Sequence, residues 1–521
     1  MGVLSQLEPK SVFYYFEEIT EIPHGSGNVE QISDYLADFA KQRNLFFLQD
    51  ELKNIIIVKD AAPGYEDEPG VILQGHMDMV AVKKPGCPMD MKTEGLQIGI
   101  DGDNIYAKDT SLGGDDGIAV AYALAILDSD TIKHPRLEVV ITVDEETGMD
   151  GARGIDLSML KGKRLLNLDS EKEGIFLTSC AGGARVKCLL PVGQGMPVGQ
   201  GASVGQDVSV GQGAMEGVLC EVAIDGLKGG HSGDEIHKER GNSNALLGRI
   251  LHHLALRLPF GIVSMEGGLA DNAIPRESRA VLVVGKKDIS LFEEIVAHVA
   301  KQIKEELAVK DPKVSVRVKK DIGGRIGERG AYVCSTPEDA KKMAAFLAAL
   351  PNGVQAMSAD IKGLVETSLN MGILKYNAAD EQAADVRAEG AGSLLAEFSV
   401  RSSVESAKEA LIEKLRAVTC LAGGSVEVTG DYPGWKYRAD SPLREKLIRL
   451  YEKMYGEKPR LEAIHAGLEC GILGSKIKDL DGVSIGPDMK NIHTTEETLS
   501  ISSTARVWEY LVRLLEEKDI D

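Results

Sequence analysis

The chain has 521 residues and a formal charge of −21, because 80 aspartates and glutamates outnumber 59 lysines and arginines. Nucleic acids and anionic membranes attract clustered basic residues, so this balance disfavours both as partners. The composition, 43% hydrophobic and 27% charged, is that of an ordinary soluble globular protein. A chain of this length exceeds what one hydrophobic core serves, and we therefore expect two or more domains.

Neither a membrane span nor a secretory signal is predicted. No apolar run approaches the roughly 20 residues that cross a bilayer, and the first residues lack a basic stretch followed by an apolar one. The seven cysteines are scattered and form no CxxC pair, which argues against a disulfide framework or a thiolate zinc site. We expect a cytoplasmic protein.

The first 180 residues alternate between helix and strand. Apolar residues recur at helical spacing in NVEQISDYLADFAKQR, and GIAVAYALAIL (117–127) is a second, strongly apolar helix. Between the helices lie short β-branched runs, at 54–59, 71–74, 137–143 and 164–168. This alternation predicts an α/β sheet that is covered on both faces.

From about residue 183 the pattern changes. Apolar and polar residues alternate, as in strands with one face in water, and helical stretches intervene. These segments are 216–227, 278–285, 289–307 and 404–417. After about 405 the α/β pattern returns, and the chain ends in an amphipathic helix near 500–517. We infer an α+β domain over 185–404 that is inserted into a domain formed by 1–184 and 405–521.

A short repeat interrupts the inserted domain. Val-Gly-Gln recurs within residues 192–215, as VGQGMP, VGQGAS, VGQDVS and VGQGAM. Tandem hexads so rich in glycine and small residues are typical of a weakly ordered loop, with a stacked β-turn structure as the alternative. The repeat carries no group able to do catalytic chemistry.

Histidines and carboxylates follow several of the predicted strands. They are His76 and Asp78, then Asp144, Glu145 and Glu146, then Asp169, and much later His493. Because the carboxyl ends of strands in an open α/β sheet form the crevice where ligands bind, we expect these side chains at one edge. Each of these residues alone is typical of a structural turn, but four segments together indicate a functional site.

A glycine-rich turn adds two more carboxylates. Asp115 and Asp116 follow SLGG and precede the apolar helix, a position that in isolation is typical of helix capping. Imidazole and carboxylate groups without thiolates suit Zn, Mn or Co, and two metals roughly 3.5–4 Å apart need a bridging carboxylate and further ligands on each side. The residues that provide such a set are His76, Asp115, Glu146, Asp169 and His493.

Two further carboxylates lie beside this set. Glu145 would remain free next to the metals, where it can accept a proton from water and return it to a leaving amine. Asp78, two residues from His76, can hydrogen-bond an imidazole ligand and fix its tautomer.

These motifs resemble a family of metallopeptidases that includes carnosinases, peptidase T and succinyl-diaminopimelate desuccinylase, and more closely the bacterial aminoacyl-histidine dipeptidases. The strings that carry the resemblance are GHMDMV, LGGDDGIAVAYALAIL, VDEETGMDGARG, NLDSE, GLKGGHSGDEIHKERGNSNALLGR, LEAIHAGLECGIL and GPDMKNIHTTEE. The resemblance covers nearly the whole chain. The VGQ repeat departs from it, as does Asp116, where some relatives carry Asn.

The resemblance implies a fold and a metal centre. The fold is a zinc-peptidase catalytic domain, with helices on both faces of a mixed sheet, interrupted by an inserted α+β lid domain. Two zinc ions per subunit, with Co²⁺ or Mn²⁺ as substitutes, would be bridged by Asp115. His76 and Asp169 would complete one metal site, and Glu146 and His493 the other.

The resemblance also implies catalytic and substrate-binding roles. Glu145 would be the general base, and Asp78 the residue that orients an imidazole ligand. His231, in the lid motif GGHSG, would stabilise the oxyanion of the tetrahedral intermediate. Asn272 and Arg401 resemble substrate-contacting lid positions, and the fork of an Arg suits the C-terminal carboxylate of a substrate.

A last segment resembles the family's substrate-end segment in the C-terminal catalytic portion. It is HAGLECG, with His465 and Glu469, and Glu469 would receive the free amino group of a dipeptide. A surface helix would place the same two residues on one face with no catalytic role. Relatives are often dimers that pair through the lid, so a homodimer is the default expectation.

The resulting hypothesis is a dinuclear-metal dipeptidase that hydrolyses unblocked dipeptides, with Xaa-His or β-Ala-His favoured. A related tripeptidase, carboxypeptidase or N-acyl amino acid deacylase with the same metal centre is the alternative, because only the pocket would differ. A metal-binding protein without activity is a third interpretation. The presence of Glu145 together with all five expected ligands argues against it.

Overall fold

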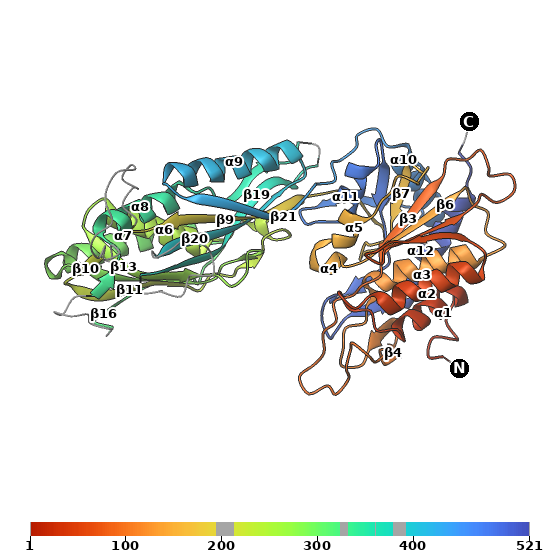
Figure 1. The fold of residues 1–521 in the computed structure, drawn as a ribbon, viewed down its shortest axis with the longest axis horizontal. Helices are drawn as coiled ribbons and strands as arrows, with labels where there is room; N and C mark the ends of the chain where they lie inside the picture. Colours follow the sequence, from red (N-terminus) through yellow and green to blue (C-terminus); the bar gives the residue numbers. More distant parts are fainter. Residues whose placement is uncertain (1, 194–212, 323–331, 360, 379–391, 520–521) are drawn as a thin grey trace, which may run out of the picture. The chain divides into compact units, whose positions relative to one another are not determined.

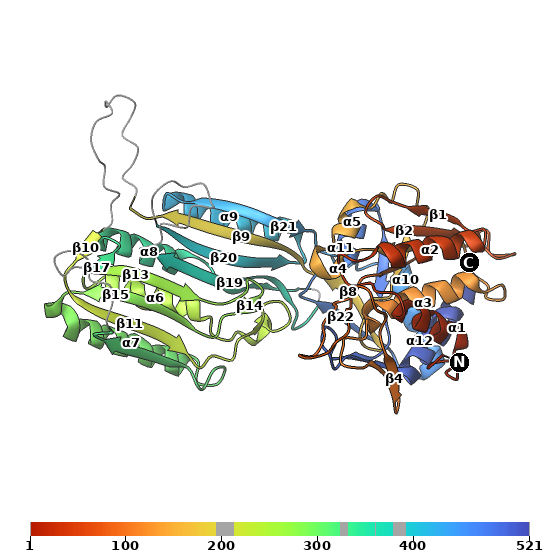
Figure 2. The same cartoon turned by 60° about the horizontal axis from the view of Figure 1, so that its bottom comes forward.

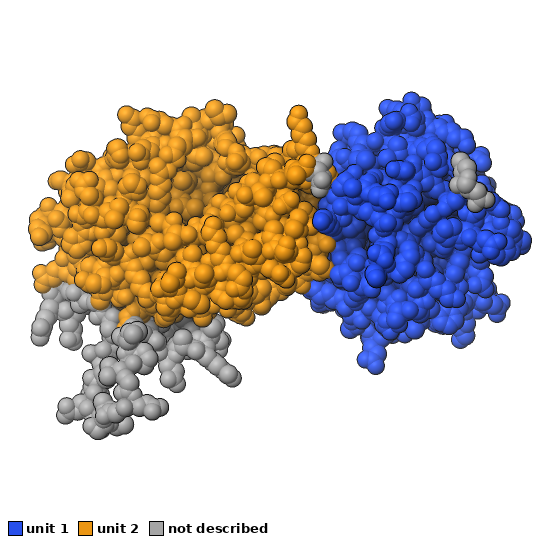
Figure 3. Space-filling view, turned by 90° about the horizontal axis from the view of Figure 1, so that it is seen from above, with its two compact units in different colours: residues 1–180, 435–463, 467–521 blue, residues 181–434, 464–466 orange. Residues whose placement is uncertain are grey.

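The computed structural model of the chain describes residues 2–193, 213–322, 332–359, 361–378 and 392–519 (Figure 1, Figure 2). The chain divides into two compact units (Figure 3). By residue number, unit 1 comprises 1–180, 435–463 and 467–521, and unit 2 comprises 181–434 and 464–466. Unit 2 is therefore an insertion into the sequence of unit 1.

Unit 1 is built on a mixed sheet of eight strands in the order β1-β2-β6-β3-β7-β23-β8-β22. In chain order these are β1 (Phe46–Gln49), β2 (Ile55–Lys59), β3 (Val71–His76), β6 (Leu137–Thr142), β7 (Arg164–Asn167), β8 (Ile175–Cys180), β22 (Arg460–Ile464) and β23 (Asp481–Ser484). Strand β3 runs parallel to β6 and β7, whereas β1 and β2 are antiparallel. The β-branched runs predicted from the sequence all form strands of this sheet.

Helices cover both faces of this sheet. The helices that share a hydrophobic core with one face are α1 (Lys10–Thr20), α2 (Glu30–Gln42), α3 (Gly114–Asp128), α10 (Pro442–Tyr455) and α12 (Ile501–Glu516). In β6, Val139 belongs to that core, while Thr142 on the opposite face donates a hydrogen bond to Glu469, where α11 (Glu469–Lys476) begins. The short helices α4 (Glu145–Gly148) and α5 (Asp150–Gly154) follow β6. The predicted sheet with both faces covered is confirmed.

A smaller antiparallel sheet in unit 1 holds the connection that contains His493. Its order is β24-β25-β5-β4, and its strands are β4 (Ile98–Asp101), β5 (Asn104–Ala107), β24 (Met489–Lys490) and β25 (Thr498–Ser500). The connection between β24 and β25 contains His493 and Glu497. Because β24 pairs with β25 and β25 with β5, both ends of this connection are held by the sheet.

Unit 2 contains a nine-stranded sheet in the order β16-β11-β15-β13-β19-β20-β9-β21, with β18 paired to β19. Its strands are β9 (Gly182–Pro191), β11 (Val218–Asp225), β13 (Phe260–Gly267), β15 (Ser278–Val284), β16 (Ser315–Lys320), β18 (Gly353–Met357), β19 (Val365–Asn377), β20 (Ser393–Ser402) and β21 (Ser425–Tyr432). Short pairs form between β10 (Gly213–Met215) and β17 (Tyr332–Cys334), and between β12 (Gly230–His231) and β14 (Ala273–Ile274).

The helices of unit 2 lie along one face of its sheet (Figure 2). They are α6 (Ser243–Ala255), α7 (Ile289–Glu306), α8 (Pro337–Ala349) and α9 (Glu405–Leu421), with one 3₁₀ turn at Ile236–Lys238 and another at Lys286–Asp288. Cys220 and Val222 of β11 are buried in the shared core, whereas Glu221 between them is only half-buried. This agrees with the apolar–polar alternation, which predicted strands with one solvated face.

The second boundary of the insertion differs from the prediction. The division falls after Gly434 rather than after residue 404. Helix α9 contributes Leu411 and Leu415 to the core of unit 2, and β21 pairs with β9 along its length. Helical periodicity identified the helix near 404–417, but periodicity does not indicate against which sheet a helix packs.

Most of the VGQ repeat, residues 194–212, lies outside the described residues, so the interpretations of that segment stay predictions. The described helices include none with the length and apolar character needed to cross a membrane.

A buried lysine of α9 forms ion pairs and a hydrogen bond that connect this helix to the end of β21. The Lys408 side chain is 1% exposed, and its Nζ lies 2.9 Å from Glu405 Oε1 and 2.6 Å from Asp431 Oδ1. The same Nζ donates a hydrogen bond of 2.6 Å to the carbonyl oxygen of Tyr432. We expect Lys408→Ala to lower the unfolding free energy of unit 2 by about 2–3 kcal/mol, because it removes buried charged hydrogen bonds and leaves a void.

Urea-dependent hydrogen exchange of the segment 405–432 measures this change. Lys414→Ala, at an exposed position of the same helix, is the matched control. Unchanged exchange of that segment in the Lys408→Ala variant would contradict the stabilising role of the Lys408 contacts.

Candidate functional site

The strand ends of unit 1 gather histidine and carboxylate side chains. Strand β3 ends at His76, β7 is followed by Asp169, and β6 is followed by Glu145 and Glu146 at the start of α4. These three strands are parallel neighbours, so their carboxyl ends lie at the same edge of the sheet. Three of the four predicted segments therefore meet at this edge, whereas His493 comes from the connection between β24 and β25 of the smaller sheet.

Two imidazoles and three carboxylates of the predicted metal set are in direct contact. His76 Nε2 lies 3.2 Å from Asp115 Oδ1 and 3.8 Å from Asp169 Oδ1. His493 Nε2 lies 3.3 Å from Asp115 Oδ2 and 2.8 Å from Glu146 Oε1. Asp115 therefore contacts one imidazole through each of its two oxygens. The five residues form two groups that share this one carboxylate.

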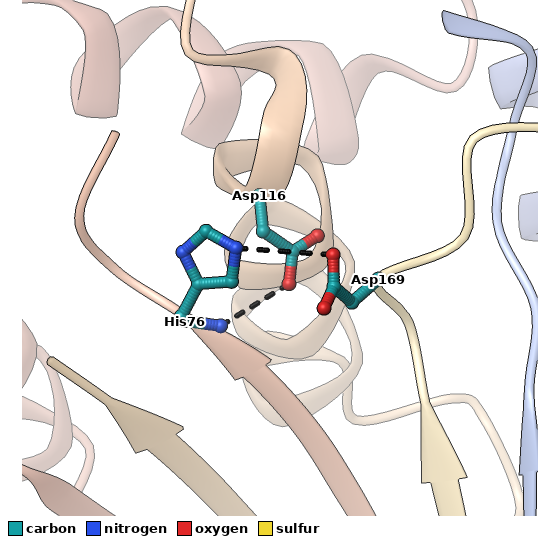
Figure 4. Close-up of side chains that lie close together, drawn as sticks. All are labelled: His76, Asp116 and Asp169. Carbon is teal, nitrogen blue, oxygen red and sulfur yellow. Dashed lines mark hydrogen bonds and ion pairs between the residues drawn. The ribbon is translucent and has the colours of Figure 1, made fainter. Parts of the chain in front are cut away.

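Asp116 belongs to the same cluster, although the sequence-based ligand set contained only Asp115 of this pair. His76, Asp116 and Asp169 each offer a ligand atom within 4.8 Å of the others (Figure 4). The same holds for His76, Asp115 and Glu146. Asp116 is fully buried, and its Oδ2 accepts the backbone N–H of His76 at 3.1 Å. The adjacent Asp115 and Asp116 could have indicated this in the sequence, but their spacing alone does not tell which of the two carboxylates faces the site.

A glycine makes this approach of Asp116 to the strand feasible. A Cβ atom on Gly75 would lie 2.5 Å from Asp116 Oδ2 and 2.7 Å from the Cβ of Ala119. Since real Cβ atoms do not approach an oxygen so closely, any side chain at position 75 would displace Asp116 or helix α3.

The cluster has the chemistry of a cation site. The side chains of Asp115, Glu146 and Asp169 are at most 10% exposed. Asp116 Oδ1 is buried without a hydrogen-bond partner among the described residues. Buried carboxylates so close together are costly unless protons or a cation neutralise them. Imidazole and carboxylate donors suit Zn²⁺, Mn²⁺ or Co²⁺, so these residues fit a divalent metal.

The protonation of the cluster reflects the same crowding. Burial raises the pKa values of Asp116 and Asp169 well above their ordinary range, and neighbouring carboxylates reinforce the effect. Hydrogen bonds to Asp115 and Glu146 raise the pKa of His493 to about 10. Without a cation, His493 is therefore protonated at neutral pH.

Asp78 holds two parts of the site together. The Nδ1 of His76 donates to the carbonyl oxygen of Asp78 at 2.9 Å, and the Asp78 carboxylate is farther away, at 3.5 Å from Nδ1. With the proton on Nδ1, the Nε2 lone pair is directed at the carboxylates. The Asp78 carboxylate accepts the backbone N–H of Glu145 at 3.0 Å and the hydroxyl of Ser26 at 2.8 Å. No sequence motif indicated a role for Ser26.

Glu145 and Glu469 are carboxyl groups beside the cluster. Burial, together with the charges of Glu469 and Glu146, raises the pKa of Glu145 to about 8. Burial likewise raises the pKa of Glu469 to about 7. Glu469 Oε2 accepts hydrogen bonds of 2.5 Å from Gln74 and from Thr142, and its Oε1 is buried without a partner among the described residues. Cations beside Glu145 would favour its ionised form.

The other predicted site residues lie in unit 2. His231 ends β12 and pairs with Ala273 of β14, and the carbonyl oxygen of Asn272 accepts the N–H of Ser232 at 2.8 Å. The hairpin-like pairing therefore brings His231 and Asn272 close together in unit 2. Asp234 donates its backbone N–H to His231 Nδ1 at 3.2 Å, and its Oδ2 lies 3.4 Å from the same nitrogen.

Arg401 and His465 are buried in unit 2 with unused polar atoms. Arg401, on β20, is 9% exposed, and its Nη1 donates to the hydroxyl of Tyr432 at 3.3 Å. His465 is 6% exposed, and its Nε2 lies 2.7 Å from the hydroxyl of Ser368. Arg401 Nε and His465 Nδ1 have no hydrogen-bond partner among the described residues. Burial and the charge of Arg401 lower the pKa of His465 to about 3, so the imidazole is neutral.

The sequence resemblance placed His465 in the C-terminal part of the catalytic domain, but the structure places it in unit 2. Residues 464–466 belong to unit 2, whereas Glu469 belongs to unit 1. His465 lies between β22 and α11, so one helix does not carry both residues. The spacing of four residues between His465 and Glu469 therefore does not place them on one face of a helix.

Binding of a divalent metal to the metal-free protein should release protons, because His493 is protonated below pH 10 and only the neutral imidazole is a ligand. We expect His493→Asn to reduce the release at pH 7 by about one proton per chain. Calorimetric titrations with Zn²⁺ in two buffers of different ionisation enthalpy measure the number. His237→Asn, at an exposed position of unit 2, is the control. Equal proton release in the wild type and His493→Asn would contradict the expected role.

Comparisons with known proteins identify the family of the chain. The sequence profile described as peptidase family M20/M25/M40 matches residues 72–517. The chain is 34% identical over 517 residues to the cytosol non-specific dipeptidase of Escherichia coli (strain K12), with 99% of each chain covered.

Solved structures agree as well. The aminoacylhistidine dipeptidase of Vibrio alginolyticus is 34% identical, with a TM-score of 0.85 over 99% of this chain and 98% of that one. The aminopeptidase PepT of Bacillus cereus ATCC 10987, 16% identical with a TM-score of 0.52 over 98% of both chains, shares the fold. The resemblance carried by the motifs is confirmed: the chain belongs to peptidase family M20/M25/M40.

Proposed function

We propose that this hydrolase is a dinuclear-metal dipeptidase that cleaves unblocked dipeptides, with Xaa-His and β-Ala-His among its substrates. The observation that carries the proposal is the pair of His–carboxylate groups that share Asp115, with Glu145 beside them. The names of the Escherichia coli and Vibrio alginolyticus relatives support the substrate class.

The metal centre would use the contacts already described. His76 and Asp169 would hold one ion, Glu146 and His493 the other, and Asp115 would lie between them. Bound divalent cations supply polarisation of the scissile carbonyl and lower the pKa of water. Zn²⁺ is the proposed metal, and Co²⁺ or Mn²⁺ are the proposed substitutes. The buried, unpartnered oxygen of Asp116 makes this carboxylate a candidate for a further contact.

The protein's own groups would move the proton. Glu145 would take it from the attacking water and deliver it to the leaving amine. Asp78 would support this step in two ways, because it accepts the backbone N–H of Glu145 and its carbonyl oxygen orients His76.

Unit 2 would recognise the substrate and act as the lid. His231 would donate an N–H to the oxyanion. Arg401 would bind the substrate carboxylate, with His465 and Asn272 as further contacts; the unused Arg401 Nε supports this role. In unit 1, the unpartnered Oε1 of Glu469 would receive the free amino group.

Location and assembly follow the same relatives. We propose that the protein works in the cytoplasm, as the name of the Escherichia coli relative states for that protein. A homodimer that pairs through unit 2 stays a prediction, and the mass of the protein in solution tests it.

Hydrolysis of Ala-His and β-Ala-His by metal-depleted protein, before and after addition of Zn²⁺, tests the proposed function. We expect cleavage only with metal. Glu145→Gln should lower kcat by about 10²–10⁴-fold, because the proton acceptor is lost while the shape is kept. Asp150→Asn, at an exposed position just after α4, is the matched control.

The outcome also separates the alternatives. Zinc-loaded wild-type protein that leaves both dipeptides intact would exclude the His-dipeptide assignment. A panel of tripeptides, N-acyl amino acids and N-blocked dipeptides then identifies a tripeptidase, carboxypeptidase or deacylase. Tight metal binding without turnover of any of them would identify a non-catalytic metal-binding protein.

The proposed role of Arg401 predicts a distinct kinetic change. We expect Arg401→Lys to raise KM for Ala-His by about tenfold with a smaller change in kcat, since Lys cannot make the bidentate contact. The wild type should prefer Ala-His to its C-terminal amide, and the variant should lose that preference. Arg416→Lys, an exposed arginine on α9, is the control. A preserved preference for the free carboxylate in Arg401→Lys would exclude Arg401 as its partner.

A further inference from the structure

The turn that carries Asp115 is held by a carboxylate from the far end of the chain. Glu497 Oε2 accepts the backbone N–H of Leu112 at 2.8 Å and of Gly113 at 3.2 Å. Glu497 Oε1 accepts the N–H of Gly114 at 2.9 Å and of Asp115 at 3.4 Å. Four consecutive amides therefore converge on one side chain that is only 4% exposed.

The local sequence provides no other acceptor for these amides. The residue before α3 is Gly113, which adopts φ 69° and has no side chain to cap the helix. The first N–H groups of a helix have no partner within the helix, and a side chain normally supplies one from the N-cap position. Here the carboxylate comes from 382 to 385 residues farther along the chain.

The burial of Glu497 near Asp115 has an electrostatic cost. A carboxylate near Asp115 experiences like-charge repulsion and loses its hydration. The convergent N–H groups at the start of a helix offset this cost, because they form an anion-binding concavity. The same carboxylate is fixed in the sheet by β25, which begins at the next residue and pairs with β5.

Glu497 also belongs to the connection that carries His493. His493 lies four residues before Glu497, between β24 and β25, and its side chain is 43% exposed. A half-exposed histidine in a loop has little packing to define its position. The bonds from Glu497 to the turn of Asp115 join the two loops, whose histidine and carboxylate lie 3.3 Å apart.

We propose that Glu497 is a positioning residue for the metal centre, which sets the distance between Asp115 and His493 by tying their loops together. The inference rests on the proposed metal site and deepens it. Glu497 does not touch the metal; it acts through the backbone of the turn at 112–115.

A purely structural cap and a positioning residue have different consequences. Loss of a cap lowers stability and leaves the ligand geometry of folded molecules unchanged. Loss of a positioning residue weakens metal binding in molecules that are still folded, as outer partners of metal ligands typically do by about 10–100-fold. Metal affinity and coordination spectra, measured on folded protein, therefore separate the two.

The test uses full-length Glu497→Gln protein, with Glu496→Gln as the matched control. The amide of Gln keeps the shape of the side chain but directs an NH₂ group at two backbone N–H donors. Glu496 is its neighbour in the same loop and contacts Lys84 instead, with 2.7 Å between Oε1 and Nζ. Chelator competition gives the metal affinity, and the visible absorption of Co²⁺-loaded protein reports the ligand geometry.

We expect Glu497→Gln to bind Co²⁺ and Zn²⁺ about 10–100-fold more weakly and to change the Co²⁺ spectrum, while Glu496→Gln matches the wild type. A folded Glu497→Gln protein with wild-type affinity and spectrum would overturn the inference. Neither readout requires substrate. Failure of the dipeptidase assignment, with intact metal binding, is thereby distinguishable from failure of this inference.

A second measurement needs no variant and so does not depend on whether Glu497→Gln folds. In metal-free wild-type protein, the amides at 112–115 should exchange with deuterium slowly, because Glu497 accepts all four. Exchange of that segment as fast as in an exposed loop would overturn the inference.

Discussion

The repulsion among carboxylates buried at one edge of a sheet is the constraint on which the arrangement of unit 1 depends. Asp115, Asp116, Glu146 and Asp169 lie close together with two imidazoles, and hydrophobic strands and helices exclude most of the surrounding water. Like charges at such distances are costly unless compensated. Protons neutralise part of the cluster in the metal-free protein, and divalent cations would compensate it fully.

Hydrogen bonds from the surrounding structure also stabilise these buried carboxylates and hold their segments in place. The missing side chain of Gly75 lets Asp116 reach the backbone N–H of His76. Asp78 joins the imidazole of His76 to the backbone of Glu145, and Glu497 accepts the amides before helix α3. Each of these contacts joins a ligand-bearing segment to a rigid element. A metal site needs such support because its ligands must be held at fixed distances before the cation arrives.

In the proposed function, the residues that recognise the substrate and those that carry the chemistry belong mostly to different units. Unit 1 contains the metal-type cluster, whereas His231, Arg401 and His465 belong to unit 2. Buried polar atoms without partners, such as Arg401 Nε, are costly in a protein interior and are typical of groups that await a ligand. An insertion of this kind allows substrate preference to change without any alteration of the metal centre. This is why family membership leaves the substrate side chain open.

The sequence by itself determined the residue types of the site and most of the elements that carry them. The β-branched runs before His76 and Asp169 predicted their strands, because a strand buried on both faces must be apolar throughout. Only the tertiary structure decided the partners: that Asp116 reaches His76, that α9 packs on unit 2, that His465 belongs there, and that Glu497 holds the turn of Asp115. Local patterns report burial and periodicity, whereas a contact between residues hundreds of positions apart depends on how separate elements pack, which no local pattern encodes.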